Sequence, residues 1–201
     1  MSLSTVIFDL GGVLIDWNPR YLYRRLIADE EQMERFLATI CTQEWNEQQD
    51  AGRPFATAVA VLTEQYPEHA SLIQAYDDHW GDMVSGSVAG TVAVLDELAA
   101  TDVRLLALTN WSAEKFPIAR ERFEFLNRFE GIVVSGTENT RKPYRDIYDI
   151  LFERYAVNPE TAVFIDDSAA NVDMGQQLGL HAIRFHNPDA LRAELAALGL
   201  L

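Results

Sequence analysis

The sequence predicts an α/β fold, in which a doubly wound parallel sheet carries an inserted all-helical cap. Two observations indicate this fold. Continuous apolar runs of four to six residues, typical of strands buried on both faces, alternate with segments whose apolar residues recur at helical spacing. One stretch, from about residue 19 to residue 84, contains only the helical spacing. Because strands that alternate with helices form parallel sheets, we expect a Rossmann-like core with a helical insertion.

The first strand of the core is predicted at Val6-Ile7-Phe8, directly before Asp9. The core resumes after Gly86, where helical and strand-like segments alternate to the end of the sequence. Further strands are expected near residues 103–108, 131–135, 162–165 and 181–185, and helices near residues 88–100, 113–125, 146–155, 169–178 and 191–201.

The insertion is predicted to consist of four helical segments. Their apolar residues fall near residues 21–26, 33–40, 55–62 and 72–80. Gly52-Arg53-Pro54 and Pro67 interrupt this pattern, as expected for connections between helices. We therefore assign residues 1–17 and 85–201 to the core and residues 18–84 to the cap.

Composition restricts the function classes. The chain has 201 residues, of which 48% are hydrophobic, which is enough for one core and a small insertion. Its net charge of −15 argues against nucleic acid or an anionic membrane as partner. Cys41 is the single cysteine, so no internal disulfide forms. No apolar run is long enough to span a membrane and the N-terminus lacks the basic start of a signal peptide, so we expect a cytoplasmic protein.

Polar residues follow three of the predicted strands. Asp9 follows the first, Thr109 the second, and the pair Asp166-Asp167 a later one, while Lys142 lies in the loop Arg141-Lys142-Pro143. Ligands of parallel sheets bind at the carboxyl ends of the strands. The carboxylates there could hold a hard cation, and the hydroxyl and the ammonium group could bind phosphate oxygens. The sequence therefore predicts a phosphate-and-magnesium site.

In this order, the four motifs resemble the haloacid dehalogenase-like hydrolase superfamily, and the resemblance covers nearly the whole chain. The similarity is to the phosphatase branch with a helical cap after the first motif, which includes sugar-1-phosphate phosphatases and proteins like the N-terminal domain of epoxide hydrolases. The resemblance implies that Asp9 is the nucleophile, that Thr109 binds the transferring group, and that Lys142 neutralises both the nucleophile and the phosphoryl oxygens.

The resemblance also implies a Mg²⁺ cofactor. Its ligands would be Asp9, the backbone carbonyl of Gly11 and Asp166, with help from Asp167, and Asn171 lies nearby in the same loop. The implied activity is hydrolysis of small phosphomonoesters, among them sugar phosphates, through an aspartyl-phosphate intermediate. The implied partner is a small phosphorylated metabolite, and the chain is expected to act as a monomer or a homodimer.

One position departs from the family pattern. Phosphatases of this family usually carry a second aspartate two residues after the nucleophile, and this chain carries Gly11. That aspartate protonates the leaving group and then activates water, and positioned acid–base catalysis contributes about 10²–10⁴ in rate. Asp16 is a candidate substitute, although a carboxylate near a helix N-terminus is the alternative explanation for it.

Several residues are candidates for contact with the substrate. Trp111 and Asn110 directly follow Thr109, and Trp17 lies near the junction with the cap. Trp45 and Asn46 of the cap could also face the site. Packing between cap and core is the alternative explanation for the tryptophans.

Two other functions stay open. The 2-haloacid dehalogenases use the same aspartate at carbon without a metal, and Gly11 and Tyr148 match their pattern. They replace the acidic pair by serines, however, and carry a halide-binding arginine where this chain has Thr39-Ile40-Cys41-Thr42. The other alternative is a weakly active member that binds a phosphorylated ligand or a protein, for which Gly11 is the only support.

Overall fold

A five-stranded parallel sheet forms the centre of the computed structural model, which describes residues 2–201. Its strand order is β5-β4-β1-β6-β7. The strands are β1 (Thr5–Phe8), β4 (Arg104–Thr109), β5 (Gly131–Val134), β6 (Ala162–Asp166) and β7 (His181–Arg184). Because β1 pairs in parallel with both β4 and β6, the residues that end these three strands meet at one edge of the sheet.

Helices cover both faces of this sheet, as the doubly wound fold requires. Alternate residues of the buried strands point to opposite faces. Ile7 packs in the cluster that includes α9 (Arg145–Tyr155) and is flanked by α10 (Ala169–Gln177). Val6 and Phe8 belong to the cluster that includes α6 (Ala89–Ala99), α7 (Phe116–Arg122) and α11 (Pro188–Ala197). The predicted α/β Rossmann-like fold is thereby confirmed.

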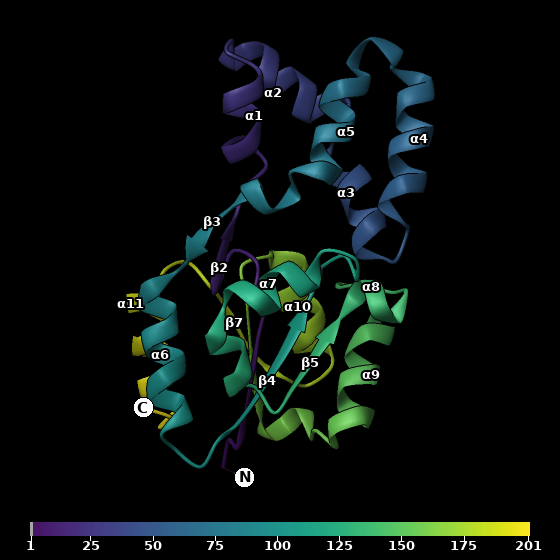
Figure 1. The fold of residues 1–201 in the computed structure, drawn as a ribbon. Helices are drawn as coiled ribbons and strands as arrows, with labels where there is room; N and C mark the ends of the chain where they lie inside the picture. Colours follow the sequence, from purple (N-terminus) through teal and green to yellow (C-terminus); the bar gives the residue numbers. More distant parts are fainter. Residues whose placement is uncertain (1) are drawn as a thin grey trace.

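A second group of helices lies above the carboxyl ends of the strands (Figure 1). It contains α1 (Arg20–Leu26), α2 (Glu30–Thr39), α3 (Gln43–Asp50), α4 (Phe55–Gln65) and α5 (Ala70–Asp78), with the 3₁₀ helices η1 (Pro67–His69) and η2 (Trp80–Met83). Aromatic rings fill its centre: the ring of Tyr23 lies 5.0 Å from that of Phe36 and 6.1 Å from that of Tyr76. This group corresponds to the segment predicted to be helical.

The structure adds a strand pair that the sequence pattern did not indicate. β2 (Ile15–Trp17) and β3 (Val84–Ser87) pair antiparallel. They lie between the core and the group of helices above it (Figure 1). Their three and four residues are too few to show a period, and β3 consists of Val-Ser-Gly-Ser. The predicted boundary between residues 84 and 85 falls inside β3.

Other elements differ in length from the prediction. The helix expected over residues 113–125 is shorter, since α7 ends at Arg122 and the 3₁₀ helix η3 (Glu124–Arg128) follows. The last helix begins at Pro188 rather than near residue 191, because the Asn187 side chain caps it, and it ends at Ala197. The short elements α8 (Ser135–Glu138) and η4 (Pro159–Thr161) were not predicted.

None of the helices in residues 2–201 has the length and apolar composition that crossing a lipid bilayer requires.

Gly136 in α8 allows a close approach to the loop that follows β4. Its backbone N–H donates to the carbonyl oxygen of Trp111 over 3.1 Å. A Cβ atom at Gly136 would lie 2.4 Å from the backbone nitrogen of Ala113 and 2.8 Å from the Trp111 oxygen. Backbone atoms in this position cannot move aside as a flexible side chain can.

We predict that Gly136→Ala lowers the free energy of unfolding by about 1–3 kcal/mol, the usual cost of inserting an atom into a packed site. Urea unfolding followed by circular dichroism measures this change. Gly86→Ala is the matched control, because a Cβ atom at Gly86 meets nothing within 4 Å. Equal stability of the two variants would contradict the prediction.

Candidate active site

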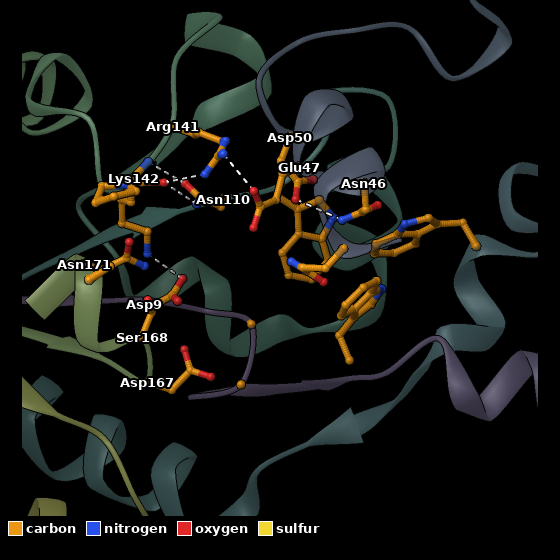
Figure 2. Close-up of a pocket in the computed structure, with 18 residues that line it drawn as sticks. Asp9, Asn46, Glu47, Asp50, Asn110, Arg141, Lys142, Asp167, Ser168 and Asn171 are labelled. Atoms are coloured by element: carbon orange, nitrogen blue, oxygen red, sulfur yellow. Dashed lines mark hydrogen bonds and ion pairs between the residues drawn. The ribbon is translucent and has the colours of Figure 1, made fainter. Parts of the chain in front are cut away.

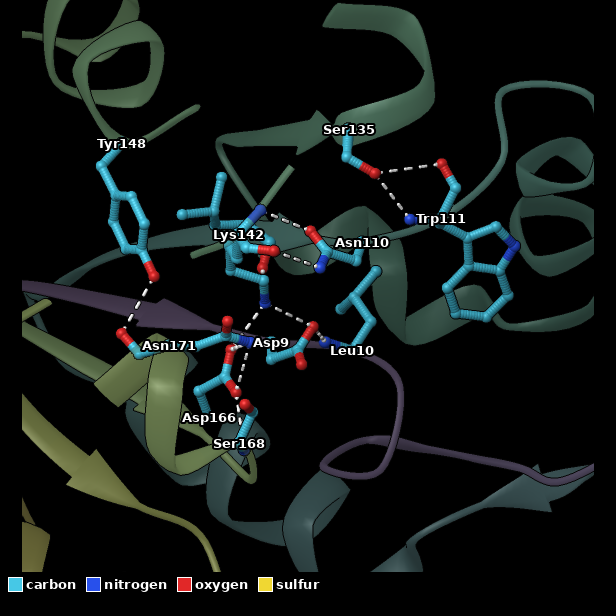
Figure 3. A network of polar contacts seen from close by, with 11 residues as sticks. Asp9, Leu10, Asn110, Trp111, Ser135, Lys142, Tyr148, Asp166, Ser168 and Asn171 are labelled. Atoms are coloured by element: carbon cyan, nitrogen blue, oxygen red, sulfur yellow. Dashed lines mark hydrogen bonds and ion pairs between the residues drawn. The ribbon is translucent and has the colours of Figure 1, made fainter. Parts of the chain in front are cut away.

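The ammonium group of Lys142 lies at the centre of the polar network at the sheet edge (Figure 3). Lys142 is fully buried, and its Nζ donates to the carbonyl oxygen of Leu108 over 2.7 Å and to Oδ2 of Asp166 over 2.6 Å. Oδ1 of Asp9 lies 2.9 Å from the same nitrogen. An ammonium group has three N–H donors, so these three acceptors satisfy it. Lys142 therefore ties together the ends of β1, β4 and β6.

The side chain of Asn110 fixes the backbone of Lys142. Oδ1 of Asn110 accepts from the Lys142 backbone N–H over 2.8 Å, and Nδ2 of Asn110 donates to the Lys142 carbonyl oxygen over 3.0 Å. Nη1 of Arg141 donates to the same carbonyl over 3.1 Å. Asn110, predicted to contact the substrate, lines the cavity and also positions the lysine loop.

The charges of this cluster perturb one another. Burial alone would lower the pKa of Lys142, but Asp166 and Asp9 outweigh it and raise that pKa. Burial raises the pKa of Asp9 to about 8, since the lowering effect of Lys142 is opposed by Asp166 and Asp167. Burial and Asp166 also raise the pKa of Asp167. One lysine thus leaves the three carboxylates short of positive charge.

The three carboxylates are close enough to share a metal ion. Ligand oxygens of Asp9, Asp166 and Asp167 all lie within 4.8 Å of one another. Asp166 is fully buried and already accepts from Lys142, from the backbone N–H of Ser168 over 2.8 Å and from Nδ2 of Asn171 over 3.0 Å. The site thus combines one fully hydrogen-bonded carboxylate with two at the cavity wall.

Gly12 makes room for the Asp167 carboxylate. A Cβ atom at Gly12 would lie 2.4 Å from Oδ2 of Asp167, and the backbone of Gly12 has φ +74, which L-residues with side chains rarely adopt. Gly11, by contrast, has nothing within 4 Å of its Cβ position. The glycine pair after Leu10 therefore accommodates one carboxylate and leaves open space beside it.

A cavity of about 620 Å³ lies over these groups (Figure 2). Asp9, Lys142 and Asp167 lie on one side of it, and Asn46 and Asp50 of α3 lie opposite. The lining residues are Asp9, Gly11, Gly12, Trp17, Gln43, Asn46, Glu47, Asp50, Trp80, Asn110, Trp111, Arg141, Lys142, Pro143, Asp167, Ser168, Ala170 and Asn171. The volume is typical of sites for small molecules.

Four of the sequence-predicted site residues do not line the cavity. One is Trp45, whose ring packs against those of Phe55 and Tyr76 within the cap helices. Thr109 is fully buried at the end of β4, and its Oγ1 has no hydrogen-bond partner among residues 2–201. Asp166 lies beneath the cavity wall, where it contacts Lys142. Asp16 is on β2, where its carboxylate accepts from the hydroxyl groups of Tyr21 and Ser85. The remaining predicted residues all line it: Asp9, Gly11, Trp17, Asn46, Asn110, Trp111, Lys142, Asp167 and Asn171.

Most residues of the opposite wall were not predicted from the sequence. Helix α3 was not predicted, because its sequence, QEWNEQQD, has almost no apolar residues. It presents Gln43, Asn46, Glu47 and Asp50, spaced as one helix face, to the cavity. The Thr42 side chain, which accepts from the backbone N–H of Trp45, is a helix N-cap that could have indicated it.

Contacts with the core hold α3 in this position. Nη2 of Arg141 lies 2.7 Å from Oε2 of Glu47, and the Ser135 hydroxyl donates to the carbonyl oxygen of Asp50. Burial raises the pKa of the Asp50 carboxyl to about 7, with a further contribution from Glu47 that Arg141 opposes. One wall of the cavity is thus a helix that carries the two carboxylates Glu47 and Asp50.

Known proteins with similar sequence or fold include phosphatases and dehalogenases. The sesquiterpene phosphatase astK of Aspergillus oryzae is 28% identical over 191 residues, which cover 94% of this chain and 92% of that protein. A family enzyme of Bacteroides thetaiotaomicron has a similar structure, with a TM-score of 0.76 and 20% identity over 93% of this chain and 95% of that one. The same enzyme has also been solved with magnesium and inorganic phosphate.

The L-2-haloacid dehalogenase of Xanthobacter autotrophicus shares the fold as well, with a TM-score of 0.64 and 16% identity over 97% of this chain and 83% of that one. The model of the haloacid dehalogenase-like hydrolase family matches residues 3–179. The motifs at the strand ends, the fold and this match agree, and the chain therefore belongs to the haloacid dehalogenase-like hydrolase family.

Proposed function

We propose that this hydrolase is a magnesium-dependent phosphatase of small phosphomonoesters, with sugar phosphates among the candidate substrates. The observation that carries the proposal is the cluster of Asp9, Asp166 and Asp167 around the buried Lys142 at the floor of a cavity. The dehalogenase reaction, a displacement at carbon, has no phosphoryl charge for a metal to neutralise. It therefore does not explain the pair Asp166-Asp167. The phosphatase name of the Aspergillus relative supports the same function.

The residues of the cluster fit Mg²⁺. Magnesium prefers oxygen ligands and commonly binds through one or two carboxylates and substrate phosphates. Asp166 already accepts hydrogen bonds from Lys142, Ser168 and Asn171, whereas Asp167 lies at the cavity wall in space that Gly12 leaves free. We therefore propose Asp9, Asp167 and the carbonyl of Gly11 as the principal ligands, with Asp166 in support. Bound Mg²⁺ would neutralise charge that develops on the phosphoryl oxygens.

The proposed reaction has two steps. An Oδ atom of Asp9 attacks phosphorus while the bond to the leaving oxygen breaks, which gives an aspartyl-phosphate and an alkoxide that takes a proton from water to become the alcohol. Water then attacks the same phosphorus, which releases inorganic phosphate and restores the carboxylate. Lys142 favours the ionised form of Asp9 against the effect of burial. The Thr109 hydroxyl on the neighbouring strand, which has no hydrogen-bond partner among residues 2–201, is the proposed donor to a phosphoryl oxygen.

The helices between β2 and β3 are proposed to act as a cap that selects the substrate and excludes water. Two observations support this proposal: α3 forms one wall of the cavity, and Glu47 of α3 contacts Arg141 of the core. Trp17 and Trp111, which line the cavity, are proposed to contact the leaving group. A cytoplasmic location and a monomeric or homodimeric state remain predictions.

We predict that hydrolysis of an aryl phosphate requires Mg²⁺ and stops when a chelator is added. Asp9→Asn should fold normally and lose activity by at least about 10³-fold, because the nucleophile is removed. Release of the aryl alcohol, read by absorbance, measures both effects. The control is Asp173→Asn, an exposed carboxylate of α10 that should retain activity.

Two results would contradict the phosphatase proposal. Metal-independent release of chloride from 2-chloropropionate without phosphatase activity would indicate a dehalogenase. Binding of phosphorylated compounds with no turnover of any phosphomonoester would indicate the weakly active, ligand-binding alternative.

A second prediction concerns the missing carboxylate at Gly11. Because a Cβ atom there meets nothing within 4 Å, Gly11→Asp should be tolerated and raise turnover of alkyl phosphates, whose leaving groups need a proton. Aryl phosphates should gain little. The gain should stay well below about 10²–10⁴-fold, because the new carboxylate lacks supporting contacts. Steady-state kinetics on both substrate types measures it, and loss of activity on both, with metal still bound, would mean that the substrate occupies this space.

A further inference from the structure

Two sets of cavity-lining residues have no part in the phosphate chemistry. One set is aromatic and consists of Trp17 on β2, Trp80 in η2 and Trp111 after β4. The ring centroids of Trp80 and Trp111 lie 5.3 Å apart at an interplanar angle of 50°. The other set is the polar face of α3, which lies across the cavity from Asp9 (Figure 2).

The face of α3 presents two carboxylates and an amide oxygen to the cavity. Nδ2 of Asn46 donates to Oδ2 of Asp50 over 3.1 Å, while Oδ1 of Asn46 has no partner among residues 2–201, although Asn46 is only 5% exposed. The guanidinium of Arg141 is bonded to Glu47 and to the carbonyl oxygen of Lys142. The Asn46 carbonyl oxygen therefore lacks a donor among the described residues, and the two carboxylates of α3 at the cavity, Glu47 and Asp50, share one neighbouring cation, Arg141.

Asp50 also lacks a counter-ion. No lysine, arginine or histidine within the described residues 2–201 forms an ion pair with it, and Arg141, the nearby cation, pairs with Glu47. Asp50 is half-buried. A carboxylate partly removed from water without a cation is costly, and a ligand that brings positive charge reduces that cost.

We propose that the leaving group of the phosphomonoester carries a positively charged amine, held by Asp50, Glu47 and the Asn46 carbonyl oxygen against the tryptophan faces. The inference rests on the proposed phosphatase function and names its substrate class. An ammonium group has three donors and no acceptor, which complements this wall. Cations also bind favourably over indole rings, and hydrogen bonds between charged partners are the strong ones.

Further features of the cavity agree with a leaving group of this kind. The indole N–H groups of Trp17 and Trp111 have no partner among residues 2–201, so an oxygen on the same leaving group would find donors. The volume of about 620 Å³ admits a phosphate together with a group as large as a sugar ring. Phosphorylated amino alcohols and amino sugars combine these properties.

The test uses pairs of substrates that differ only in an amine or a hydroxyl group at one position. Phosphoethanolamine is compared with 2-hydroxyethyl phosphate, and glucosamine 6-phosphate with glucose 6-phosphate, all with Mg²⁺ and with an aryl phosphate measured in parallel. In at least one pair, kcat/KM of the amine should exceed that of the hydroxyl compound by roughly ten- to hundredfold, as for a hydrogen bond to a charged group. Asp50→Asn, which removes the charge and keeps the shape, should lower that ratio about tenfold.

Glu44→Gln is the matched control, because Glu44 lies on the same helix, is exposed and does not line the cavity. It should keep the wild-type ratio. Turnover of the aryl phosphate with no amine preference in either pair would overturn the amine inference and leave the phosphatase proposal standing. A preference for the hydroxyl compounds would also overturn it, because the acceptors of α3 would then bind a polyol. If Asp50→Asn folds and keeps the wild-type ratio of kcat/KM between amine and hydroxyl compound, the inference is overturned as well. If Asp50→Asn does not fold, the ratio measured for the wild-type enzyme decides the inference. No turnover of any phosphomonoester would overturn the phosphatase proposal itself, and this inference with it.

Discussion

The buried ammonium group of Lys142 is the interaction on which the site depends. Taking a cation and two carboxylates out of water costs several kcal/mol per ion, and only good geometry with complete hydrogen bonding offsets this cost. Lys142 meets both conditions, since its three acceptors are Asp9, Asp166 and the Leu108 carbonyl oxygen. Removal of this one charge would leave two carboxylates unpaired at the ends of β1 and β6. The same network that holds the strand ends together therefore holds the proposed nucleophile.

The network also explains why the site suits a divalent cation first and a phosphate dianion once that cation is bound. With one lysine facing three carboxylates, the pKa of Asp9 is raised to about 8, so added positive charge is needed to keep it ionised. A divalent cation supplies that charge and, once bound, favours a phosphate dianion beside it. Across the cavity, α3 repeats the imbalance with Glu47 and Asp50 against Arg141. Both ends of the cavity thus lack positive charge, and we assign the metal to one end and the substrate amine to the other.

The parts of the structure that could be predicted are those with a strong local pattern. The buried strands β1, β4 and β6 are built on continuous apolar runs. Asp9 directly follows β1, and β4 and β6 end in Thr109 and Asp166. Parallel pairing then brings these ends together without further information. The different surroundings of Asp166 and Asp167 were not predictable, because they depend on how Gly12, Ser168 and Asn171 are placed around the two carboxylates.

The cap side of the site was less predictable for a physical reason. Helix α3 is held by its Thr42 cap and by contacts with residues far away in the sequence, such as Arg141 and Ser135, rather than by an apolar stripe. Hydrophobic periodicity therefore gives no signal over residues 43–50. Trp80 is likewise a site residue only because η2 returns next to the loop that follows β4, which no local pattern specifies.

The proposed mechanism requires that Asp9 carries the phosphoryl group during turnover. Rapid acid quench of the enzyme with Mg²⁺ and an aryl phosphate, followed by mass spectrometry of the peptide that contains Asp9, measures this directly. We expect a phosphoryl group on Asp9 that is sensitive to hydroxylamine and absent in Asp9→Asn. Full turnover with no phosphorylated peptide at any quench time, together with an active Asp9→Asn variant, would contradict it.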